Sequence, residues 1–166
     1  MITYTITKYN PIFRDKNRGY KKSEWTSISD IGKIYNNIEF KIEEYLNIEN
    51  KYLAAISCFL EIIEDDYLRV EELEKHALSK VKNVKNDEDL IIMFNKVNNN
   101  LLVQKDEILQ ISRLVLREDI WCNLTHPQSL LKIEFGYDYY LYIHCSSQRQ
   151  EIVNRIVDEI GLFVEH

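Results

Sequence analysis

His144 and Cys145 are adjacent residues whose side chains could act as a base and a nucleophile. Catalysis of that kind needs the thiol within hydrogen-bond reach of the imidazole. The residues around them alternate between apolar and polar, which predicts a strand, and adjacent residues of a strand point to opposite faces of a sheet. We therefore expect a buried Cys145 and a surface His144 rather than a catalytic pair.

Other chemical motifs are missing from the sequence. Four histidines are spread along the chain without helical metal-ligand spacing: His76, His126, His144 and His166. No Cys-x-x-Cys pair accompanies them, and the four glycines are scattered singly, so neither a zinc site nor a phosphate-binding loop is predicted. Carboxylates adjoin at 43–44, 64–66 and 71–72, which is common on solvated surfaces. The sequence thus predicts no catalytic residue, no metal and no cofactor.

One strand face carries residues suited to recognition. Alternation places Asp138, Tyr140, Tyr142 and His144 on the same side of an expected strand. Tyrosines are frequent in protein-binding surfaces, because the ring and hydroxyl give a large contact area at low entropy cost. The alternative is that a helix covers this face and buries both tyrosines. The sequence leaves that choice open.

These four residues belong to an expected β-hairpin, 130–145, with its turn near Gly136. Apolar and polar side chains alternate along both strands, so one face of the hairpin should enter the core. The side chains expected to point inward are Leu131, Ile133, Phe135, Tyr139, Leu141, Ile143 and Cys145.

The charge of the chain is uneven. The formal net charge is -6, yet residues 1–40 hold seven Lys or Arg against four Asp or Glu, whereas residues 41–76 hold four against ten. An acidic chain is a poor ligand for nucleic acid but suits a basic protein. A second partner-binding surface is therefore predicted at Glu61, Glu64, Asp65, Asp66, Glu71 and Glu72. The alternative is that these acids only keep the surface solvated.

The N-terminal third should combine a strand, a loop and a short helix. Residues 2–8 alternate and are rich in β-formers, which predicts a half-buried strand. Residues 12–27 have no clear period and hold five Lys or Arg, so we expect a long surface loop. Trp25 in this loop could anchor an interface or pack onto the core. The helix should follow up to Asn36, with a buried stripe of Ile28, Ile31 and Ile34.

The middle of the chain is expected to be mostly helical. Apolar residues recur at three- or four-residue steps over 40–64, which predicts one long helix, with Glu49 interrupting its apolar face. Residues 67–75 fit a strand slightly better than a helix. A short helix capped by Asn86 is expected next, although its apolar run could also be a buried strand. A brief extended piece near 101–103 and a helix over 106–117 should follow.

The C-terminal region reads as a helix between two strands. Ser146 or Ser147 can cap a helix in which Ile152, Ile156 and Ile160 repeat, and Gly161 suits the left-handed position that ends it. A short strand at 162–164 would return to the sheet by a crossover connection. We therefore expect one α+β domain, 1–166. Its mostly antiparallel sheet would contain the N-terminal strand, the hairpin 130–145 and the C-terminal strand, packed against helix 40–64 and further helices.

The location and redox state follow from what the sequence lacks. It begins without the basic and apolar regions of a secretory signal, and no apolar run approaches the roughly 18 residues of a membrane span. We therefore expect a cytoplasmic protein with no membrane contact. Cys58, Cys122 and Cys145 lie far apart in apolar surroundings, so free, buried thiols are expected.

Three segments together resemble a known family. They are Gly-Tyr-Lys-Lys-Ser-Glu-Trp-Thr-Ser-Ile-Ser-Asp-Ile-Gly (19–32), Phe-Gly-Tyr-Asp-Tyr-Tyr-Leu-Tyr-Ile (135–143) and Gly-Leu-Phe-Val-Glu (161–165). In a short acidic α+β chain, they resemble segments of the immunity proteins of bacterial polymorphic toxin systems, in particular those of contact-dependent growth inhibition. The resemblance implies a protein that neutralises a cognate toxin domain, commonly a nuclease, by binding over or near its active site. It implies no catalytic residues.

Two other functions remain open at this point. The chain could be a small cytosolic enzyme of unrecognised type that uses scattered carboxylates and His144, or a regulatory module that binds a different protein. An acidic inhibitor fits the charge of a nuclease, because an active site that holds phosphate is basic. The sequence does not decide the oligomeric state.

Overall fold

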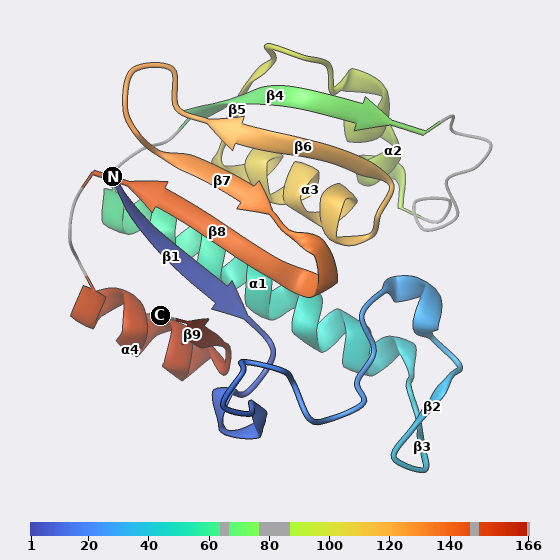
Figure 1. Cartoon of the computed structure of the whole chain (residues 1–166). Coiled ribbons are helices and arrows are strands. Elements are labelled where there is room, and N and C mark those ends of the chain that lie inside the picture. Colours follow the sequence, from blue (N-terminus) through green and yellow to red (C-terminus); the bar gives the residue numbers. More distant parts are fainter. Residues whose placement is uncertain (64–66, 77–86, 147–149, 166) are drawn as a thin grey trace.

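The computed structural model describes residues 1–63, 67–76, 87–146 and 150–165, and these residues form an α+β fold. One sheet of seven strands has the order β5-β4-β6-β7-β8-β1-β9, with each neighbouring pair antiparallel (Figure 1). Its strands are β1 (Ile2–Thr7), β4 (Tyr67–Lys75), β5 (Leu102–Gln104), β6 (Ile120–Thr125), β7 (Lys132–Phe135), β8 (Tyr140–Cys145) and β9 (Phe163–Glu165). Strands β1 and β9 pair with each other, so both ends of the chain belong to this sheet.

The helices lie on one face of the sheet. They are α1 (Ile42–Ile63), α2 (Glu88–Lys96), α3 (Lys105–Leu116) and α4 (Gln150–Ile160). In Figure 1, α1, α2 and α3 lie behind the strands and α4 lies below β1, and α1 contacts both α3 and α4. None of the four α-helices covers the opposite face, which we call the open face. No described helix is long and apolar enough to cross a membrane.

Helix α1 confirms the expected long helix. Its apolar stripe faces the sheet, and Tyr45, Tyr52, Ile56 and Phe59 are at most 2% exposed. Burying a side chain of this size contributes about 2 kcal/mol relative to leaving it in water. Both tyrosine hydroxyls donate to backbone carbonyls, Tyr45 to Leu116 at 3.1 Å and Tyr52 to Tyr139. These bonds satisfy the polar ends of rings that are otherwise in an apolar core.

Glu49, which interrupts the apolar stripe, links α1 to the end of α3. Its carboxylate is 1% exposed and accepts hydrogen bonds from Arg117 Nε at 2.7 Å and Nη2 at 2.9 Å. Arg113 Nε lies 3.1 Å from the same carboxylate. Two guanidinium groups therefore compensate the loss of hydration at the buried acid.

The hairpin 130–145 is confirmed in its pairing and its faces. All seven side chains expected to point inward are buried. His144 lies on the open face and Cys145 in the core, as the alternation predicts. The turn comes later than expected: its central residues are Asp138 and Tyr139, with φ of 55° and 63°, and Tyr140 N–H donates to Tyr137 O.

The helix expected up to Asn36 is wrong. Only a single turn forms, η2 (Ile28–Asp30), although Ser27 and Asp30 make the capping box at its start. The chain then enters a small hairpin of β2 (Ile34–Tyr35) and β3 (Ile38–Glu39). Asn36 and Asn37 have φ of 51° and 66°, the left-handed pair that a type I′ hairpin turn requires. Two of the supposed buried isoleucines are exposed, Ile31 at 37% and Ile34 at 72%.

Several smaller predictions are decided by the structure. Residues 67–75 form strand β4, the apolar run after Asp87 forms α2, and the region 106–117 matches α3. Gly161 ends α4 with φ of 81°, and β9 returns to the sheet beyond β1. The central strand β6 had no counterpart among the predicted elements. The N-cap of α2 is Asp87, whose carboxylate accepts from Leu90 N–H at 3.1 Å, and not Asn86 as expected. Asn86 and Ser147, one of the two serines proposed to cap α4, lie outside the described residues.

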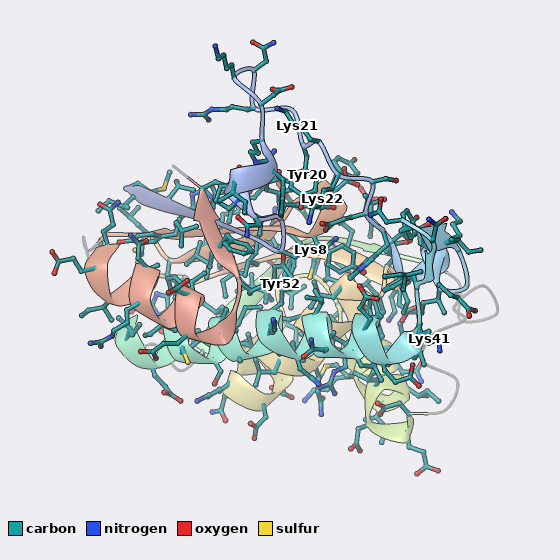
Figure 2. The ribbon with its side chains drawn as sticks, turned by 90° about the horizontal axis from the view of Figure 1, so that it is seen from below. Lys8, Tyr20, Lys21, Lys22, Lys41 and Tyr52 are labelled. Atoms are coloured by element: carbon teal, nitrogen blue, oxygen red, sulfur yellow. The ribbon has the colours of Figure 1, made fainter. Side chains whose placement is uncertain are left out.

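Contacts of Lys8 and Trp25 attach the N-terminal loop to the core. Trp25 packs in the core rather than at an exposed surface: it is 4% exposed and stacks on Phe40 with ring centroids 4.4 Å apart. Lys8 Nζ lies 4.1 Å from the centre of the Trp25 ring and 3.4 Å from Glu24. Burial lowers the pKa of this lysine. Figure 2 shows the loop with Tyr20, Lys21 and Lys22 on the side of the sheet away from α1.

Candidate partner-binding site

The predicted recognition face on β8 is not covered by a described helix, but its polar groups are already paired. His144 Nε2 lies 2.5 Å from Glu134 and Nδ1 lies 2.9 Å from Thr3. The side chain of His144 is only 14% exposed. Tyr142 is partly buried, which raises the pKa of its hydroxyl, and its ring stacks on Tyr140 with centroids 6.4 Å apart. The side chains of this part of the face therefore make most of their contacts within the chain.

The N-terminal loop occupies one end of the same face. Arg14 donates hydrogen bonds from Nη2 to the Tyr140 hydroxyl and to the Glu165 carboxylate. Its guanidinium also lies over the Tyr20 ring, 5.6 Å from the centroid. These contacts join the loop to β8 and β9, so the Tyr140 hydroxyl is shielded from a partner.

The predicted acidic segment does not form one surface. Glu61 pairs with Lys105 at 2.5 Å, and Glu71 pairs with Arg69 at 2.7 Å. Glu72 sits at an irregularity in β4 with φ of 55°, and its carboxylate accepts a hydrogen bond from Asn123. The remaining predicted acids, Glu64, Asp65 and Asp66, lie outside the described residues.

A pocket of about 400 Å³ opens where the end of β4, the start of β6, the end of α3 and the β7–β8 turn meet. Its apolar residues include Leu116, Ile120, Phe135 and Tyr139, each at most 7% exposed, which form its floor. A volume of this size is within the range of protein ligand sites. Two of the predicted site residues line it, Asp138 and Tyr140.

Three carboxylates stand at the rim of this pocket. Glu74, Glu118 and Asp138 come from three separate segments and all are exposed. None of them forms an ion pair with another residue in the described ranges, and no Lys or Arg is among the described lining residues. Burial lowers the pKa of Lys8, and the charges of Glu24, Glu44 and Asp138 oppose that shift, so Lys8 lies within electrostatic range of Asp138. The rim therefore brings together three carboxylates that have no ion-pair partner among the described residues.

Trp121 and Tyr137 form the aromatic side of the pocket. Their rings stack at 23° with centroids 5.9 Å apart, Trp121 from β6 and Tyr137 from the β7–β8 turn. Tyr137 is 87% exposed, which is unusual for a large ring. Tyr and Trp are enriched in interface hot spots, so this aromatic pair is a candidate contact for a partner.

The turn that presents Tyr137 is held rigidly. A left-handed φ is unfavourable for a residue as large as Tyr139, so other contacts must maintain it. The Tyr139 hydroxyl donates to Leu116 O at 2.9 Å, its carbonyl accepts from Tyr52, and Gly136 N–H donates to Tyr140 O at 2.7 Å. A preformed turn loses little conformational freedom when a partner binds.

Sequence reasoning missed four of these residues or gave them another role. Glu74 lay in the acidic segment but not among its selected acids, Glu118 and Trp121 were assigned no role, and Tyr137 fell out of the alternation that selected Tyr140 and Tyr142. The run of aromatic residues that flanks Asp138 could have indicated Tyr137, whereas no local pattern distinguishes Glu74, Glu118 or Trp121. The described residues contain no cluster of metal-ligating side chains.

Comparisons with known proteins add no assignment. No protein-family model, no curated protein and no solved structure matches this chain. The candidate site therefore rests on the geometry of the pocket and its rim.

Proposed function

We propose that this chain is an immunity-type inhibitor that binds a cognate toxin domain and blocks its active site. The observation that carries the proposal is the pocket rim, where Tyr137 is exposed beside Glu74, Glu118 and Asp138. The resemblance of segments 19–32, 135–143 and 161–165 to such proteins supports the same function.

The charge of the rim suits a basic partner such as a nuclease. A nuclease holds phosphate with Lys and Arg, so its active site has the charge opposite to that of the rim. Complementary charge accelerates the encounter of two proteins and fixes their orientation, while a buried aromatic group supplies most of the affinity. In this proposal the three carboxylates steer the toxin and Tyr137 anchors it.

Co-expression tests the function directly. The gene immediately upstream of this one is expected to encode a large protein that ends in the toxin domain. Expression of that domain alone should arrest growth, and co-expression of this chain should restore it. A Tyr137→Ala, Glu118→Gln, Asp138→Asn variant should fold yet restore growth less well.

The control for that variant carries Ile12→Ala, Glu61→Gln and Glu107→Gln, which alter an equal number of side chains outside the pocket lining. It should protect as well as the unaltered chain. A toxic domain that the unaltered chain neither binds nor neutralises would overturn the proposal. The enzyme and the regulatory module considered from the sequence both predict that outcome.

A further inference from the structure

We infer that the pocket holds one arginine side chain of the partner protein. The source of that arginine rests on the proposed function, but the preference of the pocket for a guanidinium group does not. The inference combines the unpaired carboxylates of the rim with the apolar and aromatic residues inside it.

The rim selects a cation. Glu74 lies near the end of β4, Glu118 follows α3, and Asp138 lies in the β7–β8 turn, so three separate segments supply the carboxylates of the pocket. A guanidinium has five N–H donors in one plane and can bond more than one carboxylate at once. The compact ammonium of lysine offers no such planar array.

The inside of the pocket favours arginine for a second reason. A guanidinium is weakly hydrated and stacks on aromatic faces, and Trp121 and Tyr137 line the pocket. The three methylene groups of arginine can lie on the apolar floor formed by Leu116, Ile120 and Phe135. Lysine would keep its hydration shell and gain less from the same rings.

The chain already holds one of its own arginines in this way. Arg14 lies over Tyr20 and Tyr140 and pairs with Glu165, so rings and a carboxylate together bind a guanidinium on this sheet. The pocket offers the same kinds of group, and no Lys or Arg is among its described lining residues.

Nuclear magnetic resonance of the full chain tests the inference. The protein has two tryptophans, so two indole N–H signals are expected, and a Trp25→Phe variant assigns them. Titration with N-acetyl-arginine amide should shift the Trp121 signal with a dissociation constant on the order of millimolar. Trp25 is buried and its indole donates to Glu44 at 3.3 Å, so its signal should move far less.

Two analogues separate charge from shape. N-acetyl-citrulline amide has the same shape without the charge and should bind about fivefold more weakly or not at all, while N-acetyl-lysine amide should bind about threefold more weakly. Equal binding of the arginine and lysine compounds would overturn the arginine assignment. Absence of any Trp121 shift at saturating arginine amide would overturn the site itself.

Variants place the ligand in the pocket. Asp138→Asn keeps a residue that tolerates the left-handed backbone, and with Glu118→Gln it should weaken arginine amide about tenfold. The charge-matched control Glu61→Gln with Glu107→Gln should leave the affinity unchanged, and equal weakening by both would contradict the assignment.

If arginine amide binds but growth is not rescued, the proposed function fails and the pocket assignment stands. If growth is rescued but no arginine amide binds, only the pocket assignment fails.

Discussion

Trp121 and Tyr137 stack with ring centroids 5.9 Å apart, although Trp121 is the second residue of strand β6 and Tyr137 lies in the turn between β7 and β8. The contact holds an 87% exposed tyrosine at the edge of a pocket whose rim has three unpaired carboxylates. The predictions below follow from this arrangement and from the ion pairs elsewhere in the fold.

Tyr137→Ala should weaken binding of the toxin domain by tenfold or more, a loss of about 1.5–3 kcal/mol, because a central aromatic contact is removed. Its stability should change by less than about 0.5 kcal/mol, since the ring is exposed. Titration calorimetry measures the affinity and urea unfolding the stability. Tyr137→Phe, which keeps the ring, should bind nearly as well. Equal affinity of the alanine variant and the unaltered chain would show that Tyr137 is no anchor.

Glu118→Gln combined with Asp138→Asn should slow association with a basic toxin domain by about tenfold at low salt, with a smaller change in the dissociation rate. The association rate of the double variant should also depend less on ionic strength. Stopped-flow fluorescence over a range of salt concentrations measures both effects. The variant pair Glu61→Gln and Glu107→Gln has the same net charge but should slow association less. A similar loss in both pairs would mean that overall charge, not the rim, steers the partner.

Glu49→Ala should destabilise the fold by about 3–5 kcal/mol, because Arg117 would keep a partly buried charge without its carboxylate. The double hydrogen bond from Arg117 and the contact with Arg113 would both be lost. Urea unfolding followed by circular dichroism gives the free energy of unfolding. Glu43→Ala, at an exposed position of the same helix, is the comparison and should cost less than about 1 kcal/mol. Similar losses in the two variants would contradict the structural role of Glu49.

Stability should fall in acid because ion-paired carboxylates titrate. Hydrogen bonds from Arg69 hold the pKa of Glu71 below its ordinary value of 4.5, and Lys96 does the same for Glu107. A carboxyl with a lower pKa in the folded state contributes stability above pH 4.5 and loses it as the pH falls through the folded-state value. Urea midpoints should therefore be steady from neutral pH to about pH 5 and then decline.

The variant Glu71→Gln with Glu107→Gln tests the cause of that decline. It should be less stable than the unaltered chain at neutral pH, and the difference should shrink as the pH falls below 4.5. A difference that stays constant across the acid range would rule out these two carboxyls as its source.

The helices and strands could be predicted from short stretches of sequence, because the spacing of apolar residues that defines each one lies within the element itself. The three- and four-residue spacing of 40–64 and the alternation of 130–145 each place apolar side chains on one face, and both faces are buried in the fold. The error at 28–35 has the same origin. Isoleucines at helical spacing suggested a helix, but Gly32 and the Asn36–Asn37 pair favour left-handed turns, and the chain forms a hairpin instead.

The sequence by itself thus determined the α+β class, the long helix, the hairpin faces and the separation of His144 from Cys145. Only the tertiary structure decided where charge remains unpaired. In the sequence, Glu49 only interrupts the apolar face of a helix. In the fold, its carboxylate accepts a hydrogen bond from Arg117, 68 positions away. The pocket likewise needs Glu74, Glu118 and Asp138 from distant segments. Periodicity reports which side of an element is apolar, whereas pairing between elements depends on contacts that no local pattern encodes.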